Sequence, residues 1–303
     1  MIEIQDVRAA AERVGARVRR TPVLQVSPSL WFKLEQTQYA GSFKTRGMVN
    51  QILAASSVPA AGIVAASGGN AGLAAAYGAR ELGLAATVFV PVTAPAVKVA
   101  KLGQLGAHVT QVGSEYAEAF VAATEHATAT GALFCHAYDD PNMVAGNGTI
   151  GLELLEQIPS GFDTVLVAVG GGGLIGGVIA ALAPAVKVVA VEPVTSSALH
   201  AALAAGTPVD VPVSGVAADS LGARQAGKIA FELARAFDIE SVLVDDQAII
   251  DARRTLWDDY RLAVEHGTAA AYAALTSGAY KPAPGERVVV LICGANTNPA
   301  DLA

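Results

Sequence analysis

Residues 62–72 read Gly62-Ile63-Val64-Ala65-Ala66-Ser67-Gly68-Gly69-Asn70-Ala71-Gly72, a short apolar run followed by a turn of small and polar residues. The apolar run predicts a buried β-strand at 62–66, and the alanine-rich residues after the turn predict a helix at about 71–82. Short apolar runs and longer alanine-rich stretches alternate in the same way along the rest of the chain. That alternation is typical of a parallel α/β architecture, so we predict an α/β fold.

The same pattern places the other expected elements. Apolar runs predict further strands at 31–35, 86–90, 108–112, 132–135, 164–169, 187–191, 241–244 and 287–292. Helices are expected between several of them, at about 95–105, 116–130 and 146–157. Residues 48–145 form one block rich in strand–helix units, which sets them apart from the residues on either side.

The composition excludes several classes of protein. Of the 303 residues, 52% are hydrophobic and 16% are charged, which fits a compact globular protein and not a disordered one. The net charge of −7 and the lack of a basic block argue against nucleic acid and membrane surfaces as partners. The apolar stretch 164–185 is rich in glycine and contains a proline, so it predicts a strand, a turn and a helix rather than a membrane span. The first residues lack a signal-peptide pattern and the chain has only two cysteines, so we expect a cytoplasmic protein.

One lysine is a candidate catalyst. Lys44 lies in Gly41-Ser42-Phe43-Lys44-Thr45-Arg46-Gly47, after a predicted strand and a short polar loop. Ser42 is the expected N-cap of a helix, which places Lys44 in the first helical turn. There the helix dipole and burial both disfavour the charged ammonium and favour a neutral, nucleophilic amine. On spacing alone an exposed lysine at the start of a surface helix is the commoner case, and the motifs below shift the balance toward a catalyst.

Two glycine-rich turns are candidate anion sites. The turn at 67–72 lies between a predicted strand and a predicted helix, where backbone N–H groups suit a carboxylate or a phosphate. Gly170-Gly171-Gly172-Gly173 follows a buried strand and opens a predicted helix, which suits a phosphate. An alternative stays open, because Gly171, Gly173 and Gly176 match a dinucleotide-binding fingerprint, with Glu192 as its acidic residue. A nicotinamide-dependent oxidoreductase is therefore a second hypothesis, although such a fingerprint usually opens the first βαβ unit of a chain.

The two cysteines receive different interpretations. Cys293 follows the last predicted strand, at the carboxyl end where ligands collect in open α/β sheets. Cys135 is expected to be a small core residue. The five histidines have no metal-ligand spacing, so no metal site is predicted.

In order and spacing these motifs resemble the serine/threonine dehydratase family of pyridoxal-phosphate (PLP) enzymes, whose fold is PLP fold type II (tryptophan synthase β-like). The resemblance covers nearly the whole chain. It is carried by Arg20-Thr21-Pro22-Val23, Lys33-Leu34-Glu35, residues 41–47, Ser67-Gly68-Gly69-Asn70, Asp139-Asp140-Pro141, Gly148-Thr149-Ile150-Gly151-Leu152-Glu153, residues 170–174 and Cys293-Gly294-Ala295-Asn296.

The resemblance implies two open, twisted, mostly parallel sheets flanked by helices, with the cofactor in the cleft between two domains. The implied large domain, which binds pyridoxal 5′-phosphate, comprises residues 1–47 and 146–303. Residues 48–145 form a small domain inserted in it. A homodimer that acts on a small amino acid is implied as well.

The resemblance also implies a role for each matching residue. Lys44 would bind the cofactor covalently and move the proton at the substrate Cα, and Phe43 would pack against the cofactor ring. Asn70 would bind the phenolic oxygen of the cofactor and Cys293 would face its ring nitrogen. The cofactor phosphate would be bound by Gly170, Gly171, Gly172, Gly173 and Leu174. The substrate carboxylate would be bound by Ser67, Gly68, Gly69, Asn70 and Ala71.

Two departures from the family pattern refine this expectation. Racemases of the family carry a second serine where this chain has Gly68, so elimination is expected in preference to racemisation. Gly215 stands where a glutamate often binds a divalent cation. No divalent metal is therefore expected, and a monovalent cation held by backbone carbonyl groups is left open.

The predicted activity is an L-threonine/L-serine dehydratase (ammonia-lyase), which removes water and releases 2-oxobutanoate or pyruvate with ammonia. The alternatives within the fold are a dehydratase for another β-hydroxy amino acid, such as 3-hydroxyaspartate or phenylserine, and an amino-acid racemase. A binding protein without catalytic activity is an alternative from another class. Threonine and serine differ by one methyl group, worth about 1–3 kcal/mol in a pocket, so the sequence leaves the preference between them open.

Overall fold

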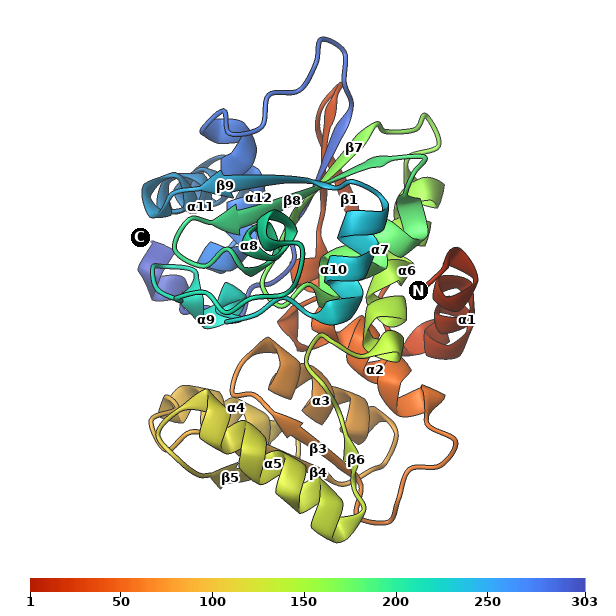
Figure 1. The fold of residues 1–303 in the computed structure, drawn as a ribbon, viewed down its shortest axis with the longest axis vertical. Coiled ribbons are helices and arrows are strands. Elements are labelled where there is room, and N and C mark those ends of the chain that lie inside the picture. Colours follow the sequence, from red (N-terminus) through yellow and green to blue (C-terminus); the bar gives the residue numbers. More distant parts are fainter. Residues whose placement is uncertain (303) are drawn as a thin grey trace.

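Two β-sheets organise the chain in the computed structural model, which describes residues 1–302 (Figure 1). The strands are β1 (Val23–Ser27), β2 (Leu30–Lys33), β3 (Ile63–Ala66), β4 (Ala86–Val90), β5 (His108–Gln111), β6 (Leu133–Phe134), β7 (Thr164–Ala168), β8 (Lys187–Pro193), β9 (Glu240–Val244) and β10 (Val288–Leu291). The six-stranded sheet has the order β1-β2-β10-β7-β8-β9, and the four-stranded sheet has the order β5-β4-β3-β6. Neighbouring strands are parallel in every pair except β1 with β2. The predicted α/β fold with two mostly parallel sheets is confirmed.

Helices flank both sheets. They are α1 (Ile4–Val14), α2 (Lys44–Ala54), α3 (Asn70–Glu81), α4 (Ala96–Gln104), α5 (Tyr116–Thr130), α6 (Pro141–Gln157), α7 (Gly173–Leu182), α8 (Ala198–Ala205), α9 (Ala218–Leu221), α10 (Lys228–Ala236), α11 (Asp246–Tyr260) and α12 (His266–Thr276). Figure 1 shows the six-stranded unit above the four-stranded unit, with α2 where the two units meet.

The central strand β7 explains why its sequence is apolar throughout. All its residues are buried. Val165 and Val167 lie in a core cluster with side chains of α7 and α10, whereas Leu166 and Ala168 lie in a second cluster with side chains of α11 and α12. A strand covered by helices on both faces has no side that meets water, so the usual alternation of polar and apolar residues disappears.

Strand β3 is covered in the same way within the smaller sheet. Ile63 and Ala65 pack with alanines of α3, and Val64 and Ala66 pack with alanines of α5. Alanine side chains fill little space, so these helices can lie close against the sheet. The alanine-rich stretches 70–81 and 116–130 are therefore the helices that cover the two faces of strand β3.

The four-stranded sheet comes entirely from the segment 48–145, and the six-stranded sheet comes from the segments on either side. This supports the proposed large domain of residues 1–47 and 146–303 and the inserted small domain of residues 48–145, whose boundaries stay a proposal. Ala303, the last residue of the proposed large domain, lies outside the described residues.

The outcome of two further predictions can be read from the helices. The stretch 164–185 forms β7, the tetraglycine turn and α7, as predicted. The helix expected at 146–157 begins earlier, at Pro141, because the Asp140 side chain accepts the backbone N–H groups of Asn142 and Met143. Within residues 1–302, no helix has the length and apolar character needed to cross a membrane.

Candidate active site

Lys44 is positioned by the end of strand β10. The backbone N–H of Phe43 donates to the Cys293 carbonyl oxygen at 3.0 Å, and Ser42 forms an isolated β-bridge with Gly294. The first turn of α2 contains Lys44, as predicted, and it therefore lies beside the carboxyl end of the six-stranded sheet. The prediction that Ser42 caps this helix is wrong, because Ser42 is extended in the bridge and Phe43 occupies the cap position. The Ser42 hydroxyl is buried and has no hydrogen-bond partner in the described part of the chain.

The environment of the Lys44 amine makes it reactive. Lys44 Nζ donates to the Ala137 carbonyl oxygen at 2.6 Å and lies 5.3 Å from the centre of the Phe43 ring. Burial lowers the Lys44 pKa from 10.5 to about 8, and the nearby Cys293 and Glu265 oppose this shift only in part. A lysine with that pKa has an appreciable neutral fraction in neutral and mildly alkaline solution, so Lys44 can act as a nucleophile or as a base.

The tetraglycine turn at 170–173 and the Lys44 side chain both contact the short segment 137–138. A side chain at Gly171 would overlap the Tyr138 ring, and one at Gly173 would come within 2.8 Å of the Tyr138 carbonyl oxygen. Tyr138 directly follows Ala137, whose carbonyl oxygen binds Lys44. The turn and the lysine therefore flank the same two residues, and only glycine fits where the turn packs against them.

Both predicted anion sites lie at helix N-termini. The turn at 67–69 leads into α3, and the tetraglycine turn leads into α7. Within residues 1–302, no protein group accepts a hydrogen bond from the backbone N–H groups of residues 70–72 or of residues 171–175. Such N–H groups at a helix start bind anions. Two clusters of donors are thus available for a phosphate and a carboxylate.

Asn70, the first residue of α3, is held from two sides. Its amide nitrogen donates to the Glu265 carboxylate oxygens at 2.8 and 3.1 Å, and its amide oxygen accepts from Asn296 Nδ2 at 2.6 Å. The amide oxygen is occupied, whereas the amide nitrogen has two N–H groups and both of its hydrogen bonds go to one carboxylate. Asn70 can therefore give one N–H to Glu265 and turn the other to a ligand. Glu265 and Asn296 belong to the six-stranded unit, so these contacts join it to the four-stranded unit.

Sequence reasoning gives Glu265 no role in the site. It lies 195 positions from Asn70 along the chain, and no local pattern links the two residues. Burial raises the pKa of Glu265, which the hydrogen bond from Asn70 opposes. The sequence signal available was an acidic residue directly before a predicted helix, which is typical of a helix cap. In the structure the Glu265 side chain does not cap α12 and instead orients the Asn70 amide.

Glu192 has a structural role. Its carboxylate oxygens accept the backbone N–H groups of Leu199 at 2.8 Å and His200 at 2.7 Å, at the start of α8. Burial raises the Glu192 pKa to about 7, although these two hydrogen bonds favour the charged form. The acidic residue of the dinucleotide fingerprint therefore caps a helix within the fold and is not free to bind a ribose.

The stretch around Gly215 is where the resemblance places a cation site. A side chain at Gly215 would come within 2.5 Å of Asp246 Oδ2. The Asp246 carboxylate accepts hydrogen bonds from Thr195 Oγ1 and from the backbone N–H of Val216, each at 3.2 Å. Over the range 1–302, no three His, Cys, Asp or Glu side chains are grouped so that they could hold a metal ion.

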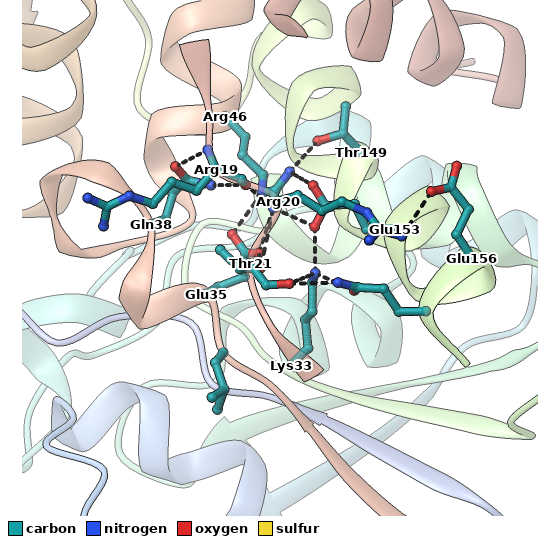
Figure 2. Close-up of polar contacts among 12 residues, drawn as sticks. Arg19, Arg20, Thr21, Lys33, Glu35, Gln38, Arg46, Thr149, Glu153 and Glu156 are labelled. Carbon is teal, nitrogen blue, oxygen red and sulfur yellow. Dashed lines mark hydrogen bonds and ion pairs between the residues drawn. The ribbon is translucent and has the colours of Figure 1, made fainter. Parts of the chain in front are cut away.

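The helix that carries Lys44 is fixed by a buried charge cluster, made up of Lys33, Glu35, Arg46 and Glu153 (Figure 2). Arg46 donates to both Glu35 oxygens at 2.8 Å, and to the two Glu153 oxygens at 2.7 and 2.9 Å. Lys33 Nζ donates to Glu153 at 2.5 Å. The side chains of Lys33, Glu35 and Arg46 are 0% exposed and that of Glu153 is 15% exposed, so the four charges balance in a site nearly free of water.

The charge cluster connects parts of the chain that are distant in sequence. Lys33 ends β2, Glu35 follows it, Arg46 lies in the first turns of α2 and Glu153 lies in α6. All four residues belong to motifs that carry the family resemblance, but the resemblance assigns them no role. In the fold they join α2, and hence Lys44, to the six-stranded sheet and to α6.

Comparisons with known proteins identify the relatives of this chain. The family description "Pyridoxal-phosphate dependent enzyme" matches residues 15–294. An L-threonine ammonia-lyase from Geobacter sulfurreducens is 35% identical over 97% of this chain and 76% of its own length. A phenylserine dehydratase from Ralstonia pickettii is 35% identical over 99% of this chain and 95% of its own length. The solved structure of maize serine racemase superposes with a TM-score of 0.90 at 31% identity, covering 99% of this chain and 95% of that one.

Proposed function

The chain belongs to the family of pyridoxal-phosphate-dependent enzymes, and on that premise we propose that it is a lyase, an L-threonine/L-serine dehydratase (ammonia-lyase). The reaction removes water from the substrate and ends in 2-oxobutanoate or pyruvate and ammonia. The observation that carries the proposal is the buried Lys44 amine, with its pKa lowered to about 8. The sequence adds Gly68 where racemases of the family carry a second serine.

The residues of the candidate site suit pyridoxal phosphate. A buried lysine of lowered pKa can bond to an aldehyde, and the unpaired N–H groups at the start of α7 suit a phosphate. An N–H of the Asn70 amide, which can be given to a ligand while the other stays on Glu265, suits a phenolic oxygen. When bound, the cofactor supplies an electron-withdrawing ring that stabilises the negative charge left on the substrate Cα after its proton is removed.

In this proposal each candidate residue keeps the role implied by the resemblance. Lys44 bonds to the cofactor, Phe43 packs against its ring, Asn70 donates to its phenolic oxygen and Cys293 faces its ring nitrogen. The phosphate is bound by Gly170, Gly171, Gly172, Gly173 and Leu174. The substrate carboxylate is bound by the loop at the start of α3, through Ser67, Gly68, Gly69, Asn70 and Ala71.

Lys44 is the group that moves the proton at Cα. Its amine takes that proton from one side of the substrate, and on the other side Gly68 has no side chain that could deliver a proton. A residue pair on opposite faces is needed to invert the centre efficiently. With Lys44 as a base and no acid or base at Gly68, elimination is therefore favoured over racemisation.

Replacing Gly68 with serine is expected to add racemase activity. A Cβ atom at Gly68 would have Val90 Cγ1 as its nearest neighbour, at 3.4 Å, so the serine fits without displacing the backbone. D-serine formed from L-serine by Gly68→Ser is measured by chiral chromatography. Gly69→Ser is the matched control, because it adds the same hydroxyl one residue further along an equally open loop. A Gly68→Ser enzyme that binds the cofactor and forms no more D-serine than the unaltered protein contradicts the proposed placement of Gly68.

Loading of the cofactor is expected to depend on pH through Lys44. Only the neutral amine attacks the aldehyde, and the Lys44 pKa is lowered to about 8. The rate of loading of cofactor-free protein should therefore rise about tenfold per pH unit below this pKa and level off above it. Stopped-flow absorbance after mixing with pyridoxal phosphate measures the rate. A rate that keeps rising to the pKa of an ordinary lysine would show that the Lys44 amine is not desolvated.

A substrate panel tests the proposed function itself. Holoenzyme is incubated with L-threonine, L-serine, phenylserine and 3-hydroxyaspartate, and both 2-oxo acid and ammonia are measured. The proposal expects the highest kcat/KM with threonine or serine. If the protein binds no pyridoxal phosphate, or releases no 2-oxo acid from threonine or serine, the proposal is rejected.

The second candidate is a dehydratase for phenylserine or 3-hydroxyaspartate, or an amino-acid racemase. It has support because relatives named phenylserine dehydratase and serine racemase are about as similar to this chain as the threonine ammonia-lyase is. The same panel, with chiral analysis of the remaining substrate, separates these activities.

We also propose that the protein is a homodimer located in the cytoplasm. Whether it binds a monovalent cation is an open question that an experiment answers. Light scattering of the purified protein measures the oligomeric state, fractionation of cells the location, and activity with and without potassium the dependence on a cation.

A further inference from the structure

His136 lies between strand β6 and helix α6, and its ring binds the backbone of the residues that follow it. His136 Nδ1 accepts the backbone N–H groups of Tyr138 at 3.3 Å and of Asp139 at 2.9 Å. Within residues 1–302, these two N–H groups have no other acceptor. The ring therefore closes a turn over residues 136–139 and sets its shape.

The two accepted hydrogen bonds fix the form of the His136 ring. A ring nitrogen that accepts an N–H group carries a lone pair and no proton, so the proton of the neutral ring lies on Nε2. Burial lowers the pKa of His136, as does the charge of Lys44, whereas Asp139 and Asp140 act in the opposite direction. The neutral ring, which can act as the acceptor, is thus the form present in neutral solution.

The turn that His136 closes lies between two parts of the candidate site. The Ala137 carbonyl oxygen accepts a hydrogen bond from the Lys44 amine at 2.6 Å. Tyr138 fills the space beside the tetraglycine turn at 170–173 with its ring and its backbone. The positions of both groups therefore depend on the conformation of residues 136–139.

The end of the turn is attached to the six-stranded unit. Asp139 Oδ1 accepts the backbone N–H of Ile229 at 3.1 Å, in the first turn of α10. Just before that helix, the backbone N–H of Gly227 donates to the Gly171 carbonyl oxygen at 3.0 Å. Asp139 thus fixes where the turn ends, and His136 fixes how the backbone runs before that point.

A fixed Ala137 carbonyl orients the Lys44 amine. A neutral amine has two N–H groups and one lone pair, and these point in different directions. When one N–H is donated to Ala137, the lone pair that attacks an aldehyde points away from that carbonyl oxygen and stays available. If the carbonyl could move, the amine would adopt more orientations, and a smaller share of them would be productive.

We infer that His136 is a positioning residue, whose neutral ring holds the turn 136–139 and, through the Ala137 carbonyl, orients the Lys44 amine of the cofactor-free protein. The inference rests on the proposed function where it concerns bonding of that amine to the cofactor aldehyde. The turn and its hydrogen bonds belong to the protein alone.

Two substitutions separate the acceptor of His136 from its ring. His136→Asn keeps an acceptor bonded to Cγ, where the imidazole has Nδ1, and it loses the ring. His136→Phe keeps a ring for the contacts with Phe120, Phe134 and Tyr138, and it loses the acceptor. If the acceptor matters, His136→Asn should resemble the unaltered protein, and if ring packing matters, His136→Phe should.

Cofactor loading measures the orientation of the amine. Cofactor-free protein is mixed with pyridoxal phosphate at a pH above the Lys44 pKa, where the amine is neutral, and the absorbance is followed by stopped flow. We expect His136→Phe to load at least about tenfold more slowly than the unaltered protein. His136→Asn should stay within about threefold of it. Circular dichroism of both variants verifies the fold.

Nitrogen-15 NMR of the cofactor-free protein examines the ring directly. We expect the Nδ1 shift of a nitrogen without a proton and the Nε2 shift of an N–H group. Both should stay unchanged at the pH at which an exposed histidine is half protonated. The signal that is missing in His136→Asn identifies His136 among the five histidines of the chain.

The outcomes distinguish this inference from the proposed function. If the protein binds no pyridoxal phosphate, the proposed function fails, and the NMR shifts still decide whether His136 is an acceptor. A proton on Nδ1 overturns the inference whatever the cofactor does. Loading of folded His136→Phe at the unaltered rate overturns it too, as does a folded His136→Asn that is as slow as His136→Phe. If His136→Phe does not fold, His136→Leu removes the same acceptor with a smaller side chain.

Discussion

The variant Lys44→Ala is expected to lose turnover by at least about a thousandfold, because it removes both the amine that binds the cofactor and the base that moves the Cα proton. The fold should persist. Lys44 makes one hydrogen bond, to the Ala137 carbonyl oxygen, and alanine is a better helix former at the start of α2. Release of 2-oxo acid measures the activity, and circular dichroism with thermal melting measures the fold.

Two further variants make the result specific. Lys44→Arg keeps a positive charge and should be as inactive as Lys44→Ala, because a guanidinium does not form the covalent bond. Lys101→Ala removes an exposed lysine of α4 and should leave turnover unchanged. A folded Lys44→Ala enzyme with normal turnover would end the assignment of Lys44 as the catalyst.

The largest effect on stability is expected from Arg46→Met. It leaves Glu35 and Glu153 without their main partner in the buried charge cluster, and unpaired buried charges of this kind destabilise by about 3–5 kcal/mol. Denaturation by urea, followed by circular dichroism, measures the free energy of unfolding. Arg20→Met is the matched control. Its ion pair with Glu156 is 57% and 69% exposed, so it should change the stability by less than about 1 kcal/mol.

The balance of charge in the cluster gives a sharper test. Glu35→Gln alone removes a negative charge, and Arg46→Met alone removes a positive one. The double variant restores the balance, so it should be more stable than the sum of the two single effects predicts. An additive result, or an Arg46→Met variant that loses less than about 1 kcal/mol, would show that the charges do not act as a unit.

The sequence predicted those features that depend on neighbouring residues. Short apolar runs marked β3 and β7, and glycine-rich turns marked the N-termini of α3 and α7, because each signal is contained within a few positions. The family resemblance assigned a cofactor, and the family match confirmed that assignment. The candidate site residues stay predictions that the variants above test.

The sequence could not predict contacts between distant segments. Glu265 and Asn296 orient the Asn70 amide from 195 and 226 positions away, so no local pattern reveals them. Ser42 looked like a helix cap because a serine before a helix usually is one. Its pairing with Gly294 in the folded chain prevents that role.

A local motif can also predict a site that the fold does not form. One example is the spacing of Gly171, Gly173, Gly176 and Glu192. It matches a dinucleotide fingerprint over a short stretch, yet the Glu192 carboxylate is used by the backbone at the start of α8. A motif fixes which residue types are present, and the fold decides which of them still have free hydrogen-bonding capacity.

The buried charge cluster constrains how this enzyme can change over generations. A substitution that removes the charge of Lys33, Glu35, Arg46 or Glu153 leaves an unbalanced charge in the interior. Such a variant is expected to be selected against even where a compensating second change would make the pair stable. Accepted changes should therefore occur in compensating pairs. A laboratory library intended to alter the substrate preference of this scaffold would retain more folded members if it kept all four positions fixed and varied the loops around them.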